Sequence, residues 1–125
     1  MRRVGRLGDG WLGAALTPDA AAEARRTIEA AAAQAGRTVD DDRYGMRRIV
    51  AFDDEPGRDF GALRRRRPDV YLAEPVPTGW AATRALIGRY AAAGVGKFVI
   101  RPATTPRSWT AFPAAFAAEL SPLET

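Results

Sequence analysis

The sequence predicts an α/β fold built from parallel βα units. Three short apolar stretches alternate with longer stretches of helical pattern along the 125 residues, and this alternation is typical of parallel strands joined by crossover helices. The first apolar stretch, residues 9–16, is nearly continuous, as in parallel strands that are covered on both faces. Together these observations predict one α/β domain over residues 1–125.

The chain opens with a helical pattern that is followed by the first strand. Residues 2–7 predict the last turns of a helix, because Val4 and Leu7 share one face and Gly8 follows as a stop. A helix with no capping residue before it leads us to expect further sequence upstream. Residues 9–16 (DGWLGAAL) predict the strand itself.

A second helix and a second strand come next. Thr17 is a good N-cap and Pro18 suits the first helical position, so the helix is expected to start there. It should run to about Ala35 and stop at the glycine that follows. Residues 44–52 (YGMRRIVAF) predict the second strand.

The remaining residues complete a third βα unit. Residues 53–77 read as a loop with one helical turn near 62–67, and residues 79–93 predict a helix with an apolar stripe. Residues 97–102 predict the third strand, and residues 108–120 predict a final helix. Three parallel strands leave both sheet edges unpaired, so we expect other sequence, another copy or a partner to cover them.

The composition excludes several kinds of chemistry. The sequence contains no cysteine and no histidine, which rules out disulfides, Cys/His metal sites and triads with a histidine base. Its apolar runs are far shorter than the roughly 20 residues that span a bilayer, and its basic start lacks the apolar segment of a signal peptide. We therefore expect a cytoplasmic protein without a metal site or a membrane partner.

The net charge is +4, and four of the positive charges form the run from Arg64 to Arg67. Such a run can bind phosphates without sequence preference. No aromatic residues are interleaved with it and no recognition motif surrounds it, so a solvated helical turn is the favoured interpretation over a nucleic-acid site. Elsewhere, Arg47 and Arg48 are neighbours in a strand and should point to opposite faces, one of them outward.

Three stretches of the chain carry a resemblance. They are residues 2–11 (RRVGRLGDGW), residues 33–37 (AQAGR) followed by 44–46 (YGM), and Thr78-Gly79 with the helix that leads into residues 90–102 (YAAAGVGKFVIRP). In this order and at these spacings, the chain resembles the bacterial luciferase-like monooxygenase family. The similarity is greatest to its actinobacterial members that use the deazaflavin coenzyme F-420.

The resemblance implies a TIM (β/α)8 barrel, of which this chain would supply the C-terminal portion of about three strands. Barrel enzymes place their sites at the C-terminal ends of the strands. Members of the family bind reduced FMN or the deazaflavin there and act as oxidoreductases or monooxygenases on small organic substrates. The cofactor carries the redox chemistry, through a flavin hydroperoxide or through hydride transfer.

The resemblance also suggests four cofactor-binding residues, without identifying a catalytic one. Trp11 would form a wall beside the flavin ring, although a core aromatic is the alternative. Asp9 and Gly10 would face the barrel interior or form an ordinary Asp-Gly turn. Arg101, at the end of the last strand, would hold a phosphate or carboxylate, or pair with a surface acid.

The family's Gly-Gly-x-Ser loop, which holds the cofactor phosphate, has no counterpart in this sequence. We therefore expect the chain alone to be inactive and to need an N-terminal half-barrel as partner. The alternative is a non-catalytic half-barrel that associates with itself or with another protein. A basic module for phosphate or nucleic acid is the third possibility.

Overall fold

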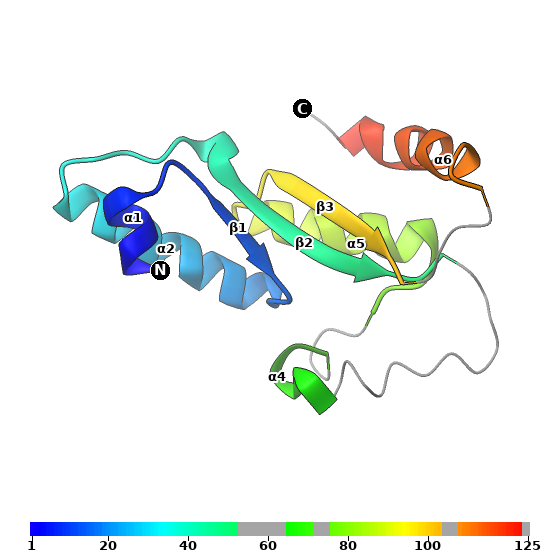
Figure 1. The fold of residues 1–125 in the computed structure, drawn as a ribbon, viewed down its shortest axis with the longest axis horizontal. Helices are drawn as coiled ribbons and strands as arrows, with labels where there is room; N and C mark the ends of the chain where they lie inside the picture. Colours follow the sequence, from blue (N-terminus) through cyan, green and yellow to red (C-terminus); the bar gives the residue numbers. More distant parts are fainter. Residues whose placement is uncertain (53–64, 72–75, 104–107, 124–125) are drawn as a thin grey trace.

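A computed structural model describes residues 1–52, 65–71, 76–103 and 108–123 of the chain. Three strands form one sheet (Figure 1). They are β1 (Trp11–Ala14), β2 (Tyr44–Val50) and β3 (Lys97–Pro102). They lie in the order β1-β2-β3, and both neighbouring pairs are parallel. The predicted α/β fold with parallel strands is therefore confirmed.

Helices separate the strands along the chain. They are α1 (Arg2–Leu7), α2 (Pro18–Gln34), α4 (Pro68–Tyr71), α5 (Gly79–Ala92) and α6 (Ala111–Leu120), with short 3-10 turns at Asp41–Arg43 and Ser121–Leu123. Because α2 follows β1, α5 follows β2 and α6 follows β3, the described residues contain three successive βα units. None of these helices has the length and apolar character needed to cross a membrane.

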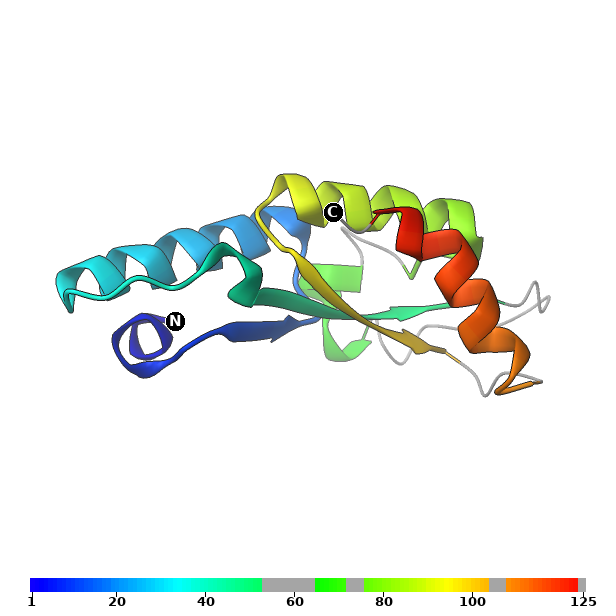
Figure 2. The ribbon, with the colours of Figure 1, turned by 90° about the horizontal axis from the view of Figure 1, so that it is seen from above.

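The sheet is covered unequally on its two faces. Figure 2 shows α2 and α5 together on one face, whereas neither helix lies on the other. Side chains alternate between the faces along each strand. Met46 of β2 and Phe98 of β3 point toward the helices, where they pack with Leu86 and Tyr90 of α5 and Ala21 of α2. The main core of the protein therefore lies between the sheet and these two helices.

Local sequence explains where α2 begins and ends. The Thr17 hydroxyl accepts a hydrogen bond from the backbone N–H of Ala20 at 3.2 Å, and Pro18 takes the first helical position. Gly36, just past the helix, has a φ of +68°, a conformation that favours glycine. The predicted helix from Pro18 to about Ala35 is thus confirmed to within one residue.

The last helix docks through aromatic side chains. Phe52, which follows β2, lies with its ring centroid 4.3 Å from that of Trp80 in α5 and 5.1 Å from that of Phe112 in α6. An ion pair between Arg84 and Glu119 also joins α5 and α6. These contacts hold α6 beside α5 as the helix of the third βα unit.

Several elements are shorter than predicted, among them β2, which ends at Val50 rather than at residue 52. The first strand is shorter than residues 9–16, since β1 ends at Ala14 and Ala15 takes a φ of +51° that breaks the extended backbone. The last helix begins at Ala111 rather than Ser108, with Thr110 at the N-cap position. The Ser108 hydroxyl accepts from the N–H groups of Thr110 and Ala111 in the turn that precedes it. The expected helical turn near 62–67 is helical at Arg65 and Arg66, and its residues 62–64 lie outside the described residues. The next described helix, α4, starts at Pro68.

Candidate functional site

The structure does not bring the four predicted cofactor-binding residues together. Asp9 and Gly10 precede β1 and Trp11 is its first residue, whereas Arg101 is the second-last residue of β3. In a parallel sheet all strands start at one edge and end at the other. Asp9, Gly10 and Trp11 therefore lie at the edge where strands begin, and Arg101 lies toward the edge where they end.

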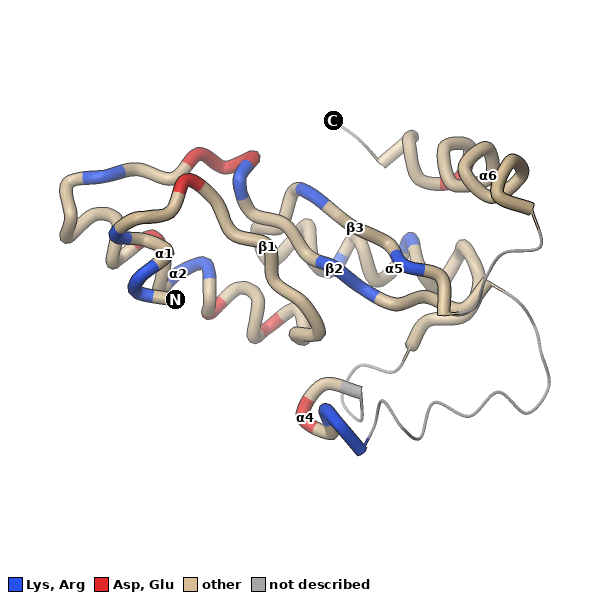
Figure 3. The backbone as a smooth tube through the Cα atoms, viewed as in Figure 1, with Lys and Arg blue, Asp and Glu red and all other residues tan. Residues whose placement is uncertain are grey.

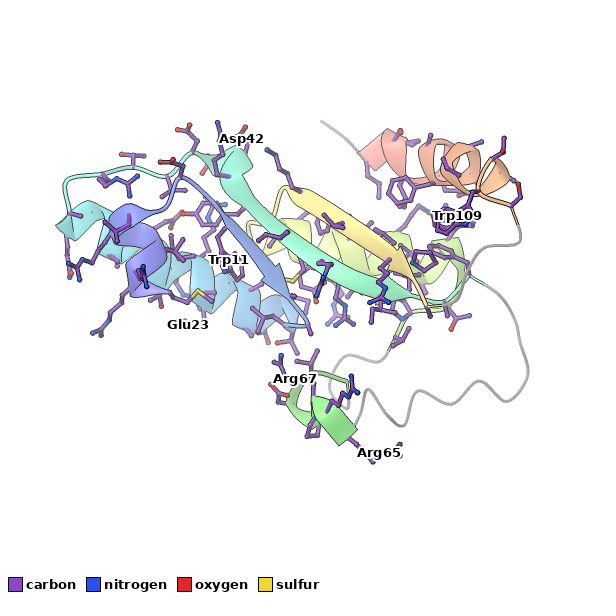
Figure 4. All side chains as sticks on the ribbon, in the orientation of Figure 1. Trp11, Glu23, Asp42, Arg65, Arg67 and Trp109 are labelled. Atoms are coloured by element: carbon purple, nitrogen blue, oxygen red, sulfur yellow. The ribbon has the colours of Figure 1, made fainter. Side chains whose placement is uncertain are left out.

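Trp11 points to the helix-covered face. It packs against both core clusters, one around Met46 and Tyr90 and the other around Ile28 and Tyr44. Figure 4 shows it between β1 and α2. This placement matches the interpretation of Trp11 as a core aromatic.

Asp9 and Gly10 are engaged in local structure. The Asp9 carboxylate forms an ion pair with Arg37 at 3.1 Å, while its side chain remains 93% exposed. Arg37 also donates to the Gly5 carbonyl at 3.2 Å, so it ties α1 to the segment before β1. A Cβ at Gly10 would lie 2.9 Å from the carbonyl oxygen of Arg43, so the two chain segments approach closely here.

The face of the sheet opposite α2 and α5 is the strongest candidate for a functional surface, and we call it the open face. It consists of Leu12, Ala14, Gly45, Arg47, Ile49, Lys97, Val99 and Arg101. The strand register arranges these residues in rows across the sheet. Leu12, Gly45 and Lys97 form the first row. Ala14, Arg47 and Val99 form the second, and Ile49 and Arg101 form the third.

The open face combines exposed apolar and cationic side chains. Leu12 is 58% exposed and Val99 is 48% exposed. Arg47, Lys97 and Arg101 are exposed around them. Figure 3 shows Lys and Arg along β2 and β3, and none of the three strands contains an Asp or Glu. Within the described residues, no carboxylate pairs with these three cations.

The arrangement is suited to binding anions. Side chains two apart on a strand share a face and are roughly 7 Å apart, so Lys97 and Arg101 lie about 13 Å apart along β3. Arg47 lies between their levels, directly across from Val99. Guanidinium groups bind carboxylates and phosphates in bidentate fashion. Within the residues that the structure describes, no group of His, Asp or Glu side chains is placed to hold a metal ion.

The sequence predicts Arg101 as a site residue but does not assign Arg47 or Lys97 to the same site. Arg47 and Arg48 do point to opposite faces, as expected: Arg47 is exposed, whereas Arg48 is 3% exposed on the helix-covered face. The alternation along the strands was a usable signal for Arg47 and Lys97. Grouping them with Arg101 also needed the register between β2 and β3, which the sequence does not reveal.

The sequence predicts that the basic run from Arg64 to Arg67 forms a solvated helical turn, and its described residues agree with that prediction. Arg65 and Arg66 are exposed, and Arg67 forms an ion pair with Asp69 at 2.9 Å. The hydrogen bond from Arg67 lowers the pKa of the Asp69 carboxyl. Arg64 lies outside the described residues. These features fit a solvated turn.

No protein-family model, curated protein or solved structure matches this chain. The fold defines its class as a protein of successive parallel βα units. Its distinguishing feature is the open face.

Proposed function

We propose that the chain forms the last three βα units of a luciferase-like (β/α)8 barrel oxidoreductase that works with reduced FMN or coenzyme F-420. The observation that supports this proposal is the open face on three consecutive parallel strands. In a TIM barrel the helices surround the strands, and the other face of every strand points inward. A sheet face that neither α2 nor α5 covers is consistent with such a wall.

The open face fits the anionic part of either cofactor. It carries three cations that no carboxylate in the described residues neutralises, and Arg101 lies toward the C-terminal ends of the strands, where barrels bind ligands. Arg101, with Arg47 in the neighbouring row, would hold a phosphate or carboxylate by charge-assisted hydrogen bonds, in addition to the phosphate loop that the N-terminal half of the barrel would supply. Trp11 faces the helices and would not touch a cofactor bound there. The bound cofactor would supply the redox chemistry.

A cofactor titration tests the proposal. The chain is titrated with FMN and with coenzyme F-420, alone and together with the N-terminal half of a luciferase-like barrel, while cofactor fluorescence is followed. We expect little or no binding to the chain alone, because three strands do not enclose a ligand, and saturable binding to the pair. Arg101→Ala should weaken binding to the pair, whereas Arg26→Ala on the far side of α2 should not. If the pair binds neither cofactor, the enzymatic assignment fails.

The second candidate function is a non-catalytic half-barrel that associates through its sheet. The exposure of Leu12 and Val99 favours it. Parallel sheets are ordinarily covered on both faces. The exposure of two large apolar side chains to water is unfavourable, and a bound partner would remove it.

A further inference from the structure

We propose that the open face binds an acidic amphipathic helix of a partner protein. The carboxylates of the helix would pair with Arg47, Lys97 and Arg101, and its apolar side chains would cover Leu12 and Val99. This inference names the partner's chemistry for the second candidate function and rests on it. It requires no cofactor.

The apolar part of the face indicates a polypeptide as the occupant. Leu12 on β1 and Val99 on β3 are both exposed, and Ile49 on β2 is half-buried. A small anion would neutralise the arginines but would leave these side chains in water. A partner that brings its own apolar side chains removes that surface from water as well.

The charges of the face decide which polypeptide fits. All of its ionisable side chains are cations, and no described carboxylate lies in a pair with them. A second copy docked through the same face would place cations against cations, which is unfavourable. A partner with carboxylates beside its apolar residues would match both features.

The dimensions of the face suit one helix. Neighbouring strands lie about 4.8 Å apart, so the distance from β1 to β3 is about 10 Å. An α-helix with its side chains is about 10 Å wide. Lys97 and Arg101 mark a length of about 13 Å, or roughly nine residues of helix. Helices are also the elements that ordinarily cover the faces of parallel sheets.

A display selection tests the inference. A library of amphipathic helices keeps an apolar stripe of Leu, Ile, Val and Ala and varies the flanking positions among Glu, Gln and Lys. We expect the full chain to select helices with Glu at the flanking positions. The double variant Arg47→Glu/Arg101→Glu should bind these helices roughly tenfold more weakly or worse, a loss of about 1.4 kcal/mol, and should itself select Lys.

A matched variant shows whether helix binding depends on the charges of the open face or only on the net charge of the protein. Arg6→Glu/Arg26→Glu makes the same change in charge on the exposed surfaces of α1 and α2, and it should keep the preference for Glu. Three results would overturn the inference: no helix recovered above background, no preference for Glu, or equal loss in both double variants. A dimer of the chain that Leu12→Ser/Val99→Ser dissociates would also overturn it, since a second copy would then be the occupant.

The two proposals fail independently. The selection contains no cofactor and the titration contains no displayed helix. Cofactor binding without helix selection would retain the barrel enzyme and reject the helix partner, and the reverse result would do the opposite.

Discussion

The guanidinium carbon of Arg25 lies 4.4 Å from the centroid of the Tyr44 ring, in a cation–π contact between α2 and the start of β2. The same side chain donates to Glu29 at 2.7 Å, to the Gly94 carbonyl at 2.6 Å and to Asp41 at 2.5 Å. One arginine therefore links α2 to the turns that precede β2 and β3. Burial alone would lower its pKa, but the ion pairs with Glu29 and Asp41 outweigh that effect and raise it.

Replacing Arg25 with alanine should destabilise the protein by about 1–2 kcal/mol, because it removes a charge-assisted hydrogen bond to backbone and the contact with the ring. The free energy of unfolding, measured by urea denaturation, gives the value. Arg26→Ala is the matched control. Among the described residues, Arg26 pairs only with Glu23 on the surface of α2, where both side chains are about two-thirds exposed. Its loss should therefore cost less than about 0.5 kcal/mol. Equal effects of the two substitutions would contradict the linking role of Arg25.

Tyr44→Phe should leave stability at neutral pH unchanged or raise it by up to about 1 kcal/mol, because the buried hydroxyl has no hydrogen-bond partner among the described residues. Burial, with the charge of Glu29, raises the pKa of Tyr44 above its usual value, although Arg25 opposes this. A raised pKa favours the neutral phenol in the folded protein. The stability that results from this preference is therefore fully present below about pH 10. It is lost as the pH rises through the pKa of Tyr44 in the folded protein.

Urea denaturation of the protein and of Tyr44→Phe at about pH 8 and about pH 11 checks this pH dependence. The variant should lose less stability at the higher pH than the parent does. Identical losses would show that the tyrosine does not titrate differently in the folded and unfolded states.

Gly5→Ala should destabilise the packing of α1 on α2 by about 2 kcal/mol or more, because a side chain there has no room. A Cβ at Gly5 would overlap the carbonyl oxygen of Ile28 and would lie 2.8 Å from the Cβ of Ala31. Gly88 offers the matched control: it lies within α5 and has nothing within 4 Å of its Cβ position. Gly88→Ala should stabilise the helix by up to about 1 kcal/mol. Thermal unfolding of both variants tests the pair, and a stable Gly5→Ala protein would contradict the close approach.

Ala15→Gly should stabilise the protein by about 0.5–1 kcal/mol. The φ of +51° at Ala15 is in the left-handed region, where a Cβ is unfavourable and glycine is not. Ala14→Gly, one residue earlier in β1, should instead cost about 0.5–1 kcal/mol, since glycine weakens a regular strand. In chemical denaturation, we expect Ala15→Gly to raise the free energy of unfolding and Ala14→Gly to lower it. Destabilisation by both substitutions would argue against a strained backbone at Ala15.

Much of the fold could be predicted because its signals are local. The bounds of β3 agree with the predicted residues 97–102, and α2 begins at the capping pair Thr17 and Pro18. The bounds of β1 could not be predicted, because its last predicted residues turn away from the sheet at Ala15 so that the chain can enter α2. The Tyr90 hydroxyl in α5 donates to the carbonyl of Leu16 and so stabilises that turn, although the two residues are far apart in the sequence.

The candidate site depended far more on long-range structure. The sequence predicts both Trp11 and Arg101 as site residues. They lie on different faces and at different edges of the sheet, and this follows from the direction and register of the strands. Arg47 and Lys97 join Arg101 only because β2 and β3 pair in one particular register.

The sequence by itself determined the order of the strands and helices and excluded cysteine and histidine chemistry, because hydrophobic periodicity, caps and composition are properties of short segments. Only the tertiary structure decided which face of the sheet the helices cover, that Trp11 lies beneath α2, and that three cations surround Val99 on the other face. The physical reason is that these relationships are set by hydrogen bonds and packing between residues far apart in the chain.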